Sequence, residues 1–186
     1  MARRHVILLC WSALAVLAAV LLTLPATAAS PVARGADDES LVILSRLDGP
    51  PLPKDLRVLE DYGSFVLARV SGAELAALPA ANIMDRMTDS TVISLASVQW
   101  DTVGGEPPIL SSLRAAGDDP YFLVQFYGPI KQEWLAGLEA LGVSVLSYQP
   151  NYAYIVRMDP SLAGAVGAAH AVRWIGRYHP AYRLAV

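Results

Sequence analysis

Residues 121–184 decide the fold, and they read YFLVQFYGPIKQEWLAGLEALGVSVLSYQPNYAYIVRMDPSLAGAVGAAHAVRWIGRYHPAYRL. The stretch opens with a short apolar run, Tyr121 to Phe126, that is rich in aromatic and branched residues. Asp118-Asp119-Pro120 precedes this run, and Gly128-Pro129 follows it. A short apolar run between such turn residues predicts a buried central strand.

The next segment predicts an amphipathic helix. Gly128-Pro129 supplies a cap position and a proline at the first helical position, where the missing N–H costs nothing. Gly142 stands where a left-handed C-terminal cap is needed. The apolar residues between them recur at helical spacing and share one face: Ile130, Trp134, Leu138 and Leu141.

Three further strands and a second helix complete the pattern. The strands are predicted at residues 143–148, 152–158 and 172–178, and Asp159-Pro160 is typical of a helix start. The order strand, helix, strand, strand, helix, strand predicts an α+β domain of the ferredoxin-like (βαββαβ) type over residues 120–186.

The first half of the chain has weaker versions of the same signals. Residues 41–47 resemble a strand, and residues 56–60 and 65–70 resemble a hairpin. Ser71 and Glu74 have the spacing of a capping box. Residues 48–53 contain three prolines, which remove backbone donors and exclude regular structure.

The two halves also resemble each other. Shifted by 88 residues, FVLARVS at 65–71 lies over AYIVRMD at 153–159, and both segments run from a strand into a helix cap. We interpret residues 41–98 as a degenerate copy of the second domain that lacks its first helix, with residues 99–119 as a linker. Because identity is low, chance likeness of two strand-to-helix junctions is the alternative.

The N-terminus has the three parts of an export signal. Arg3-Arg4 is basic, residues 6–24 are almost wholly apolar, and Ala26-Thr27-Ala28 forms an A-x-A-like cleavage site. We expect a signal peptide at residues 1–28, a linker at 29–40 and a secreted or otherwise extracytoplasmic protein. The alternative is an uncleaved membrane anchor, the one case in which we expect a membrane partner. Cleavage would also remove Cys10, the single cysteine.

Composition excludes several classes of function. The chain has 14 basic and 17 acidic residues and no basic patch with interleaved aromatics, so we do not expect nucleic-acid binding. His170 and His179 lack metal-ligand spacing, and we interpret both as structural. Asp101 is interpreted as a linker residue, because no G-x-S-x-G motif accompanies it. We therefore expect no enzyme activity and no cofactor.

Aromatic residues on the predicted strands offer the best candidate for a binding surface: Tyr152, Tyr154, Trp174 and Tyr178. Aromatic residues that alternate along strands are more often core residues and cross-strand pairs. Both interpretations stay open from the sequence.

The second half resembles the N-terminal propeptide (inhibitor I9-like) region of secreted subtilisin-like S8 family serine peptidases. The matching patterns are V-x-F-x-G-P, Y-x-P-N-x-Y-x-V-R and V-x-W-I-G-x-Y-x-P-x-Y-[KR]-L. They fall on these residues: Val124, Phe126, Gly128, Pro129, Tyr148, Pro150, Asn151, Tyr154, Val156, Arg157, Val172, Trp174, Ile175, Gly176, Tyr178, Pro180, Tyr182, Arg183 and Leu184. The resemblance covers roughly residues 120–184, with a weaker likeness over 55–102.

The resemblance implies a ferredoxin-like fold and two roles for it. The sheet face would dock on the protease and help it fold, as an intramolecular chaperone, and the tail would inhibit by entering the substrate cleft. The tail here is Tyr182, Arg183, Leu184, Ala185 and Val186. The catalytic aspartate, histidine and serine motifs are absent from the sequence, so we expect a separate propeptide-like protein or the N-terminal part of such a protease. An exported binding or scaffold module is the alternative.

Overall fold

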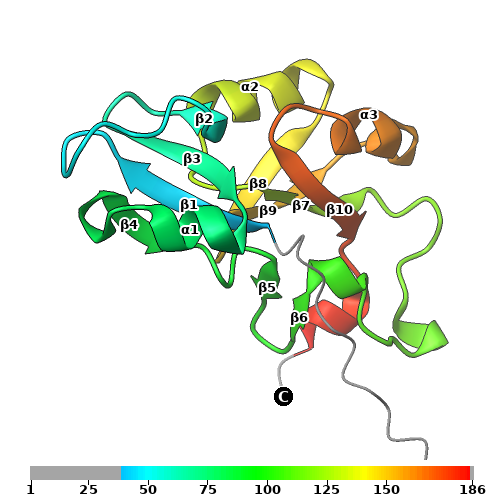
Figure 1. Ribbon diagram of the computed structural model, residues 1–186. Coiled ribbons are helices and arrows are strands. Elements are labelled where there is room, and N and C mark those ends of the chain that lie inside the picture. Colours follow the sequence, from blue (N-terminus) through cyan, green and yellow to red (C-terminus); the bar gives the residue numbers. More distant parts are fainter. Residues whose placement is uncertain (1–38, 185–186) are drawn as a thin grey trace, which may run out of the picture. The chain divides into compact units, whose positions relative to one another are not determined.

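The computed structural model describes residues 39–184 of the chain, which form an α+β structure with antiparallel strand pairs (Figure 1). The α+β class is thereby confirmed. The predicted signal peptide at residues 1–28 and the last two residues lie outside the described residues. Within residues 39–184, no helix has the length and apolar character needed to cross a membrane.

The first four-stranded sheet is built from residues 40–86. Its order is β2-β3-β1-β4, with strands β1 (Ser40–Ser45), β2 (Arg57–Asp61), β3 (Phe65–Val70) and β4 (Ile83–Arg86). The predicted capping box is present, since Ser71 accepts from the Glu74 N–H and Glu74 accepts from the Ser71 N–H. It starts helix α1 (Gly72–Ala77), which packs on one face of the sheet through Leu75 and Leu78.

The second four-stranded sheet has the order β10-β7-β9-β8. Its strands are β7 (Tyr121–Phe126), β8 (Ser144–Gln149), β9 (Ala153–Arg157) and β10 (Val172–Arg177). Helices α2 (Gln132–Ala140) and α3 (Ala163–Gly167) lie on one face of this sheet (Figure 1). The short 3-10 helix η4 (Pro160–Leu162) leads into α3 from Asp159, whose side chain accepts from the Ser161 N–H as predicted.

Helix α2 starts later than predicted. Lys131 is its N-cap, so Pro129 is not the first helical residue. The physical reason is that the Pro129 carbonyl accepts a hydrogen bond from Tyr62 of the first sheet, at 2.5 Å, instead of an intrahelical one. Trp134 and Leu138 are buried as predicted, whereas Leu141 is 40% exposed because the helix has already ended.

The two sheets have matching strand registers. In the first sheet, Ala68 of β3 pairs with Val42 of β1. In the second sheet, Val156 of β9 lies 88 residues later and pairs with Phe122 of β7. The neighbouring pairs follow in step on both sides, so the central strands of the two sheets are aligned residue by residue.

The edge strands match as well. The pairing of β2 with β3 shifts after Val58, and that of β8 with β9 shifts after Val145. Each shift leaves one residue without a register partner, Leu59 in β2 and Leu146 in β8. The partner positions at the two shifts correspond under the same 88-residue offset. An irregularity at the same place is a second register feature that the two sheets share.

The sheets differ in how their first two strands are connected. The second sheet uses α2 between β7 and β8. Residues 46–56, all of them described, form no helix between β1 and β2. This difference is the one predicted from the prolines of the segment.

The predicted linker at residues 99–119 is wrong, because it holds part of the core. Strands β5 (Val92–Ser94) and β6 (Gln99–Asp101) form a hairpin that crosses the predicted boundary. Ile93 and Trp100 from this hairpin are buried against Leu123 of the second sheet. The 3-10 helices η2 (Thr102–Gly104), η3 (Ser111–Leu113) and η5 (Pro180–Arg183) lie outside the sheets, and Tyr182 of η5 packs in the same cluster as Ile93 and Trp100.

The helix-free face of the first sheet is covered by residues that lie next to strands β7 and β9 of the second sheet. Ile43, Leu67 and Met87 form a cluster there, with Tyr127 and Tyr152 packed against it. Gly128 is in close approach, since a Cβ atom there would lie 2.9 Å from the Leu67 side chain. Both helix-free faces are therefore buried by the chain itself.

Candidate binding surfaces

The predicted inhibitory tail is folded onto the second sheet. His179 has an extended backbone, with φ −68° and ψ 147°, which the proline after it favours. Residues Pro180–Arg183 form the 3-10 helix η5, and Tyr182 is buried with its ring stacked on Trp100 at 4.9 Å. Tyr182 and Arg183 are thus not part of an extended tail. Leu184 is 52% exposed, and Ala185 and Val186 lie outside the described residues.

His179 ties η5 to the preceding loop. Its ring is buried, Nδ1 accepts from the Ala115 N–H at 2.8 Å, and Nε2 lies 3.2 Å from Glu106 Oε2. Because Nδ1 is the acceptor, Nε2 carries the proton and donates to Glu106. This contact agrees with the structural interpretation of His179. The partners could not be found from the sequence, because they lie more than 60 positions away.

The four aromatic residues predicted as a docking surface do not share a face. Tyr152 and Tyr154 pack with the core on the helix side of the second sheet. Trp174 and Tyr178 pack on the opposite side, with Trp100 and Tyr182. Successive strand residues alternate between faces, so positions on different strands need not meet. The core interpretation holds for these positions.

The W-I-G portion of the motif fits one packing feature. The ring of Trp174 lies over Gly176, where a Cβ atom would fall 2.2 Å from the ring. The same ring makes an edge contact with Trp100 at 6.1 Å. These residues and Tyr182 fix the point at which the chain leaves the sheet, and we call them the C-terminal anchor: Trp100, Trp174, Gly176 and Tyr182.

The turn between β8 and β9 has a strained backbone. Asn151 and Tyr152 both have positive φ, 61° and 62°, an arrangement that favours glycine or asparagine and costs a bulky residue free energy. Contacts hold the turn, since the Asn151 amide donates to the Val92 carbonyl at 2.9 Å and Gln125 donates to the Asn151 carbonyl. The strained turn puts Tyr152 in contact with the cores of both sheets.

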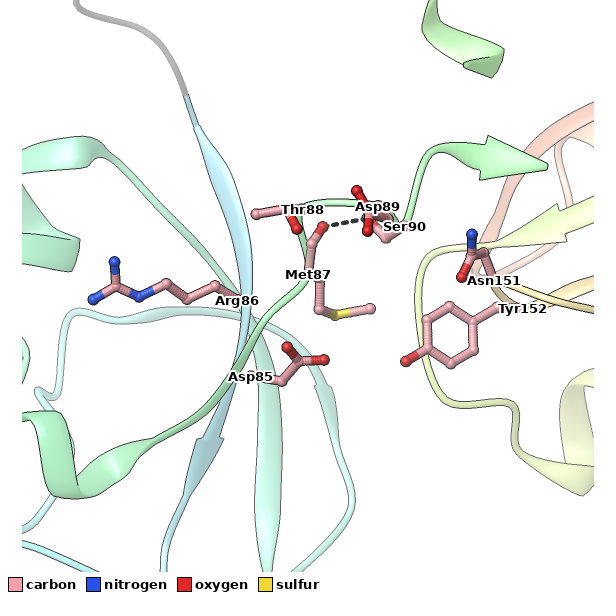
Figure 2. A pocket seen from close by; sticks show the side chains of 8 residues that line it. All are labelled: Asp85, Arg86, Met87, Thr88, Asp89, Ser90, Asn151 and Tyr152. Carbon is pink, nitrogen blue, oxygen red and sulfur yellow. Dashed lines mark hydrogen bonds between the residues drawn. The ribbon is translucent and has the colours of Figure 1, made fainter. Parts of the chain in front are cut away.

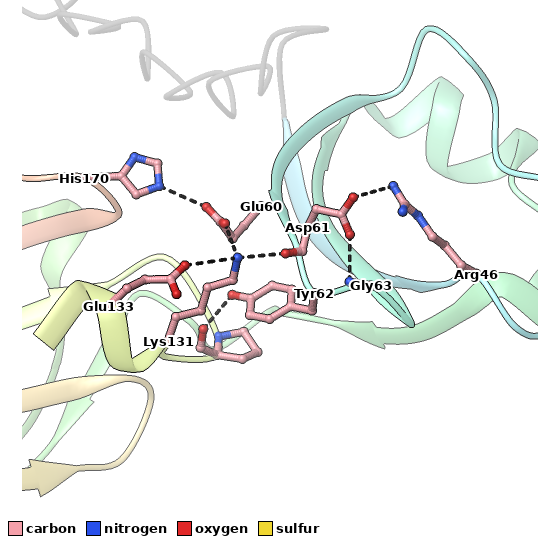
Figure 3. Close-up of polar contacts among 9 residues, drawn as sticks. Arg46, Glu60, Asp61, Tyr62, Gly63, Lys131, Glu133 and His170 are labelled. Atoms are coloured by element: carbon pink, nitrogen blue, oxygen red, sulfur yellow. Dashed lines mark hydrogen bonds and ion pairs between the residues drawn. The ribbon is translucent and has the colours of Figure 1, made fainter. Parts of the chain in front are cut away.

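A polar cluster joins the two sheets on another side, and Figure 3 shows its contacts. The Lys131 ammonium bonds the Glu60 carboxylate and the Asp61 carbonyl, and it lies 4.9 Å from the centre of the Tyr62 ring. His170 contacts the other Glu60 oxygen at 3.0 Å. We call Glu60, Lys131 and His170 the junction cluster. The sequence analysis interprets His170 as structural, but it does not identify the carboxylate partner, which lies 110 positions away.

The junction cluster makes the free energy of unfolding depend on pH in the acidic range. Burial raises the pKa of Glu60, but the hydrogen bonds and the Coulombic attraction of Lys131 and His170 together lower it by more, so it lies below its ordinary value of 4.5. A lowered pKa in the folded state stabilises the protein above pH 4.5, and this contribution is lost as pH falls through the folded-state pKa.

We therefore expect Glu60→Gln to flatten the acid dependence of the melting temperature. The wild type should lose more stability than the variant between about pH 5 and pH 3. Glu133→Gln is the matched control, because Glu133 also faces Lys131, at 3.7 Å, but is 71% exposed. Identical acid slopes for the two variants, measured by thermal unfolding, would contradict the role of Glu60.

A small polar pocket lies between the β4–β5 turn and the β8–β9 turn (Figure 2). Asp85 and Tyr152 point toward each other across it, whereas Arg86 points away. Burial and the nearby Asp85 carboxylate raise the pKa of the Tyr152 hydroxyl. The volume is about 190 Å³, below the roughly 300–1,000 Å³ usual for small-molecule sites. We assign it no catalytic or ligand-binding role.

Exposed apolar side chains are the remaining candidates for a binding surface. Val103 and Leu110, 75% and 72% exposed, lie in the segment between β6 and β7, and Leu184 follows η5. Leu146 and Tyr148, on the other hand, lie on the edge strand β8. Among residues 39–184, no group of three or more histidine, cysteine and acidic side chains could hold a metal ion.

Comparison with known protein families finds one family that matches the chain. The domain of unknown function DUF8729 matches residues 74–179, which is more than half of the 186 residues. The chain belongs to the DUF8729 family. The DUF8729 match begins within α1 and ends at His179, so it includes the β5–β6 hairpin and the whole second sheet. No curated protein and no solved structure matches this DUF8729 chain.

Proposed function

We propose that the protein is an exported, non-catalytic binding module of the subtilisin-propeptide type, which inhibits a subtilisin-like serine protease or assists its folding. In this proposal each four-stranded sheet is a ferredoxin-like unit, and the first is a degenerate copy of the second. The strand order β10-β7-β9-β8 supports the ferredoxin-like assignment, since α2 connects β7 to β8 and α3 connects β9 to β10 along the chain. The matched registers of the two sheets support the duplication.

The C-terminal anchor is the observation that carries the proposal. It consists largely of residues that the resemblance to propeptides singles out, and it fixes the chain up to Leu184. A segment that leaves a rigid body from a fixed point is presented to a partner at a high effective concentration. The inhibitory segment in this proposal therefore starts at Leu184, two residues later than the sequence alone predicts.

The docking surface cannot be the helix-free face of the second sheet, as the resemblance alone implies, because other segments of the chain cover that face. We place docking on the outside of that cover. The candidate contacts are Val103 and Leu110, which are exposed in the segment between β6 and β7, and they would mark an interaction site if they form one contiguous apolar patch. The segment from Leu184 would add to the protease cleft by main-chain hydrogen bonds.

An inhibition assay with a subtilisin-type protease tests the proposal. We expect the intact protein to slow peptide hydrolysis, and deletion of Leu184, Ala185 and Val186 to weaken inhibition at least about tenfold while the melting temperature stays unchanged. Val103→Asp and Leu110→Asp should each weaken it too. Met84→Asp, at a 59% exposed position of the first sheet, is the matched control and should inhibit like wild type.

An exported scaffold module without a protease partner is the second candidate. The specific observation in its favour is that both helix-free faces are buried by the chain's own segments. If the folded protein, the tail deletion and the surface variants all leave the protease equally active, this candidate replaces the first.

A further inference from the structure

The loop that replaces a helix in the first sheet leaves a groove. Its volume is about 430 Å³, and its apolar lining consists of Pro51, Leu52, Pro53, Leu56 and Val58. The prolines are exposed, the leucines are half-buried, and Val58 is 42% exposed. The volume lies in the range of about 300–1,000 Å³ typical of ligand-binding clefts. We call this site the proline groove.

The proline groove occupies the place that α2 fills in the second sheet. Leu52 and Leu56 pack on the same cluster as α1, so the groove is on the helix side of the first sheet. Val58 belongs to the edge strand β2, which matches β8 in position and in register. In the second sheet, α2 lies beside β8 on that side (Figure 1). One sheet thus carries a helix where the other carries the groove.

The charged residues that line the groove indicate which side chains a bound segment should carry. The two charged residues that line the groove are both basic: Arg46 and Lys54. Arg46 already pairs with Asp61 at 2.8 Å, while Lys54 makes no ion pair with the residues that the structure describes. An acidic side chain beside an apolar stripe would complement this rim.

We propose that the proline groove binds an amphipathic helix of a partner protein, with apolar residues at i and i+4 and an acidic residue next to them. The chain's own α2 has this pattern, with Trp134 and Leu138 four residues apart and Glu133 and Glu139 beside them. Helix-in-groove binding with such anchors is a common mode of recognition. The inference rests on the matched registers and not on a protease partner, so it and the proposed function can fail separately.

A peptide with the sequence of residues 129–142 is a suitable probe. A hydrocarbon staple between the exposed positions 136 and 140 holds it helical, which a short free peptide would not be. We expect saturable binding to the full-length protein by fluorescence anisotropy. Val58→Asp should weaken binding at least about tenfold, and Lys54→Glu about threefold in low salt.

Two controls make the outcome decisive. Met84→Asp, on the opposite edge strand of the same sheet, should bind the peptide like wild type, and thermal unfolding checks that every variant is folded. An unstapled peptide with proline in place of Ala136 should not bind. Equal binding of this broken peptide would show that the groove takes an extended segment. That result, the absence of saturable binding, or full binding by both Val58→Asp and Lys54→Glu would overturn the proposal.

Discussion

Trp134→Ala should destabilise the protein by about 3–5 kcal/mol, the usual cost of truncating a large buried aromatic residue. Trp134 is 6% exposed, and its ring stacks on Phe126 with centroids 5.7 Å apart. Tyr62 from the first sheet contacts the same ring edge-on at 6.5 Å. The substitution would leave a cavity on the helix side of the second sheet and weaken the contact between the two sheets. Chemical denaturation measures the loss.

Trp134→Phe is the matched control for this expectation. The indole N–H of Trp134 is buried without a hydrogen-bond partner among the described residues. Its removal offsets part of the lost packing, because a buried unpaired donor costs about 1–3 kcal/mol. We therefore expect Trp134→Phe to lose well under half of what Trp134→Ala loses. If Trp134→Ala unfolds at the same denaturant concentration as wild type, the packing of α2 on the sheet is wrong.

Tyr182→Ala should be similarly damaging, at about 3–5 kcal/mol, because Tyr182 is a core residue of the C-terminal anchor. The residue is 3% exposed and contacts Trp100, Tyr178 and His179. A residue in a free, extended inhibitory tail would instead tolerate alanine with little change. Thermal and denaturant unfolding therefore distinguish the folded anchor from the tail that the sequence alone predicts.

Tyr182→Phe separates packing from polarity at the same position. The Tyr182 hydroxyl is buried and has no hydrogen-bond partner among the described residues. Its removal should leave stability within about 1 kcal/mol of wild type or raise it slightly. A large loss in Tyr182→Phe would mean that the hydroxyl makes a contact that the structure does not show. Wild-type stability in Tyr182→Ala would mean that η5 is not packed on the sheet.

Much of the strand pattern can be predicted from local sequence. The apolar run of β7 and the capping box before α1 are set by near neighbours, and both were predicted to within a residue or two. The start of α2 was not, because Tyr62, 67 positions away, binds the Pro129 carbonyl. Local signals specify an element only where no distant contact competes for its backbone groups.

The candidate surfaces were harder to predict, for a related reason. Trp100 is flanked by Gln99 and Asp101 in the sequence, and nothing local indicates that it stacks on Tyr182. Without that contact, residues 99–119 resemble a linker and the residues after His179 resemble a free tail. Whether an aromatic residue lies in a core or on a docking face depends on which distant segment covers it, and periodicity does not contain that information.

The central claim, binding to a subtilisin-type protease, is tested most directly by titration of the protein into an inactive form of the enzyme that lacks its catalytic serine. Calorimetry should give a one-to-one complex with a dissociation constant of about 1 μM or tighter. This constant is equivalent to a binding free energy of about 8 kcal/mol in favour of the complex. Deletion of Leu184, Ala185 and Val186 should weaken it without unfolding the protein. The absence of any complex at about 100 μM folded protein, which corresponds to a binding free energy weaker than about 5.5 kcal/mol, would contradict the claim.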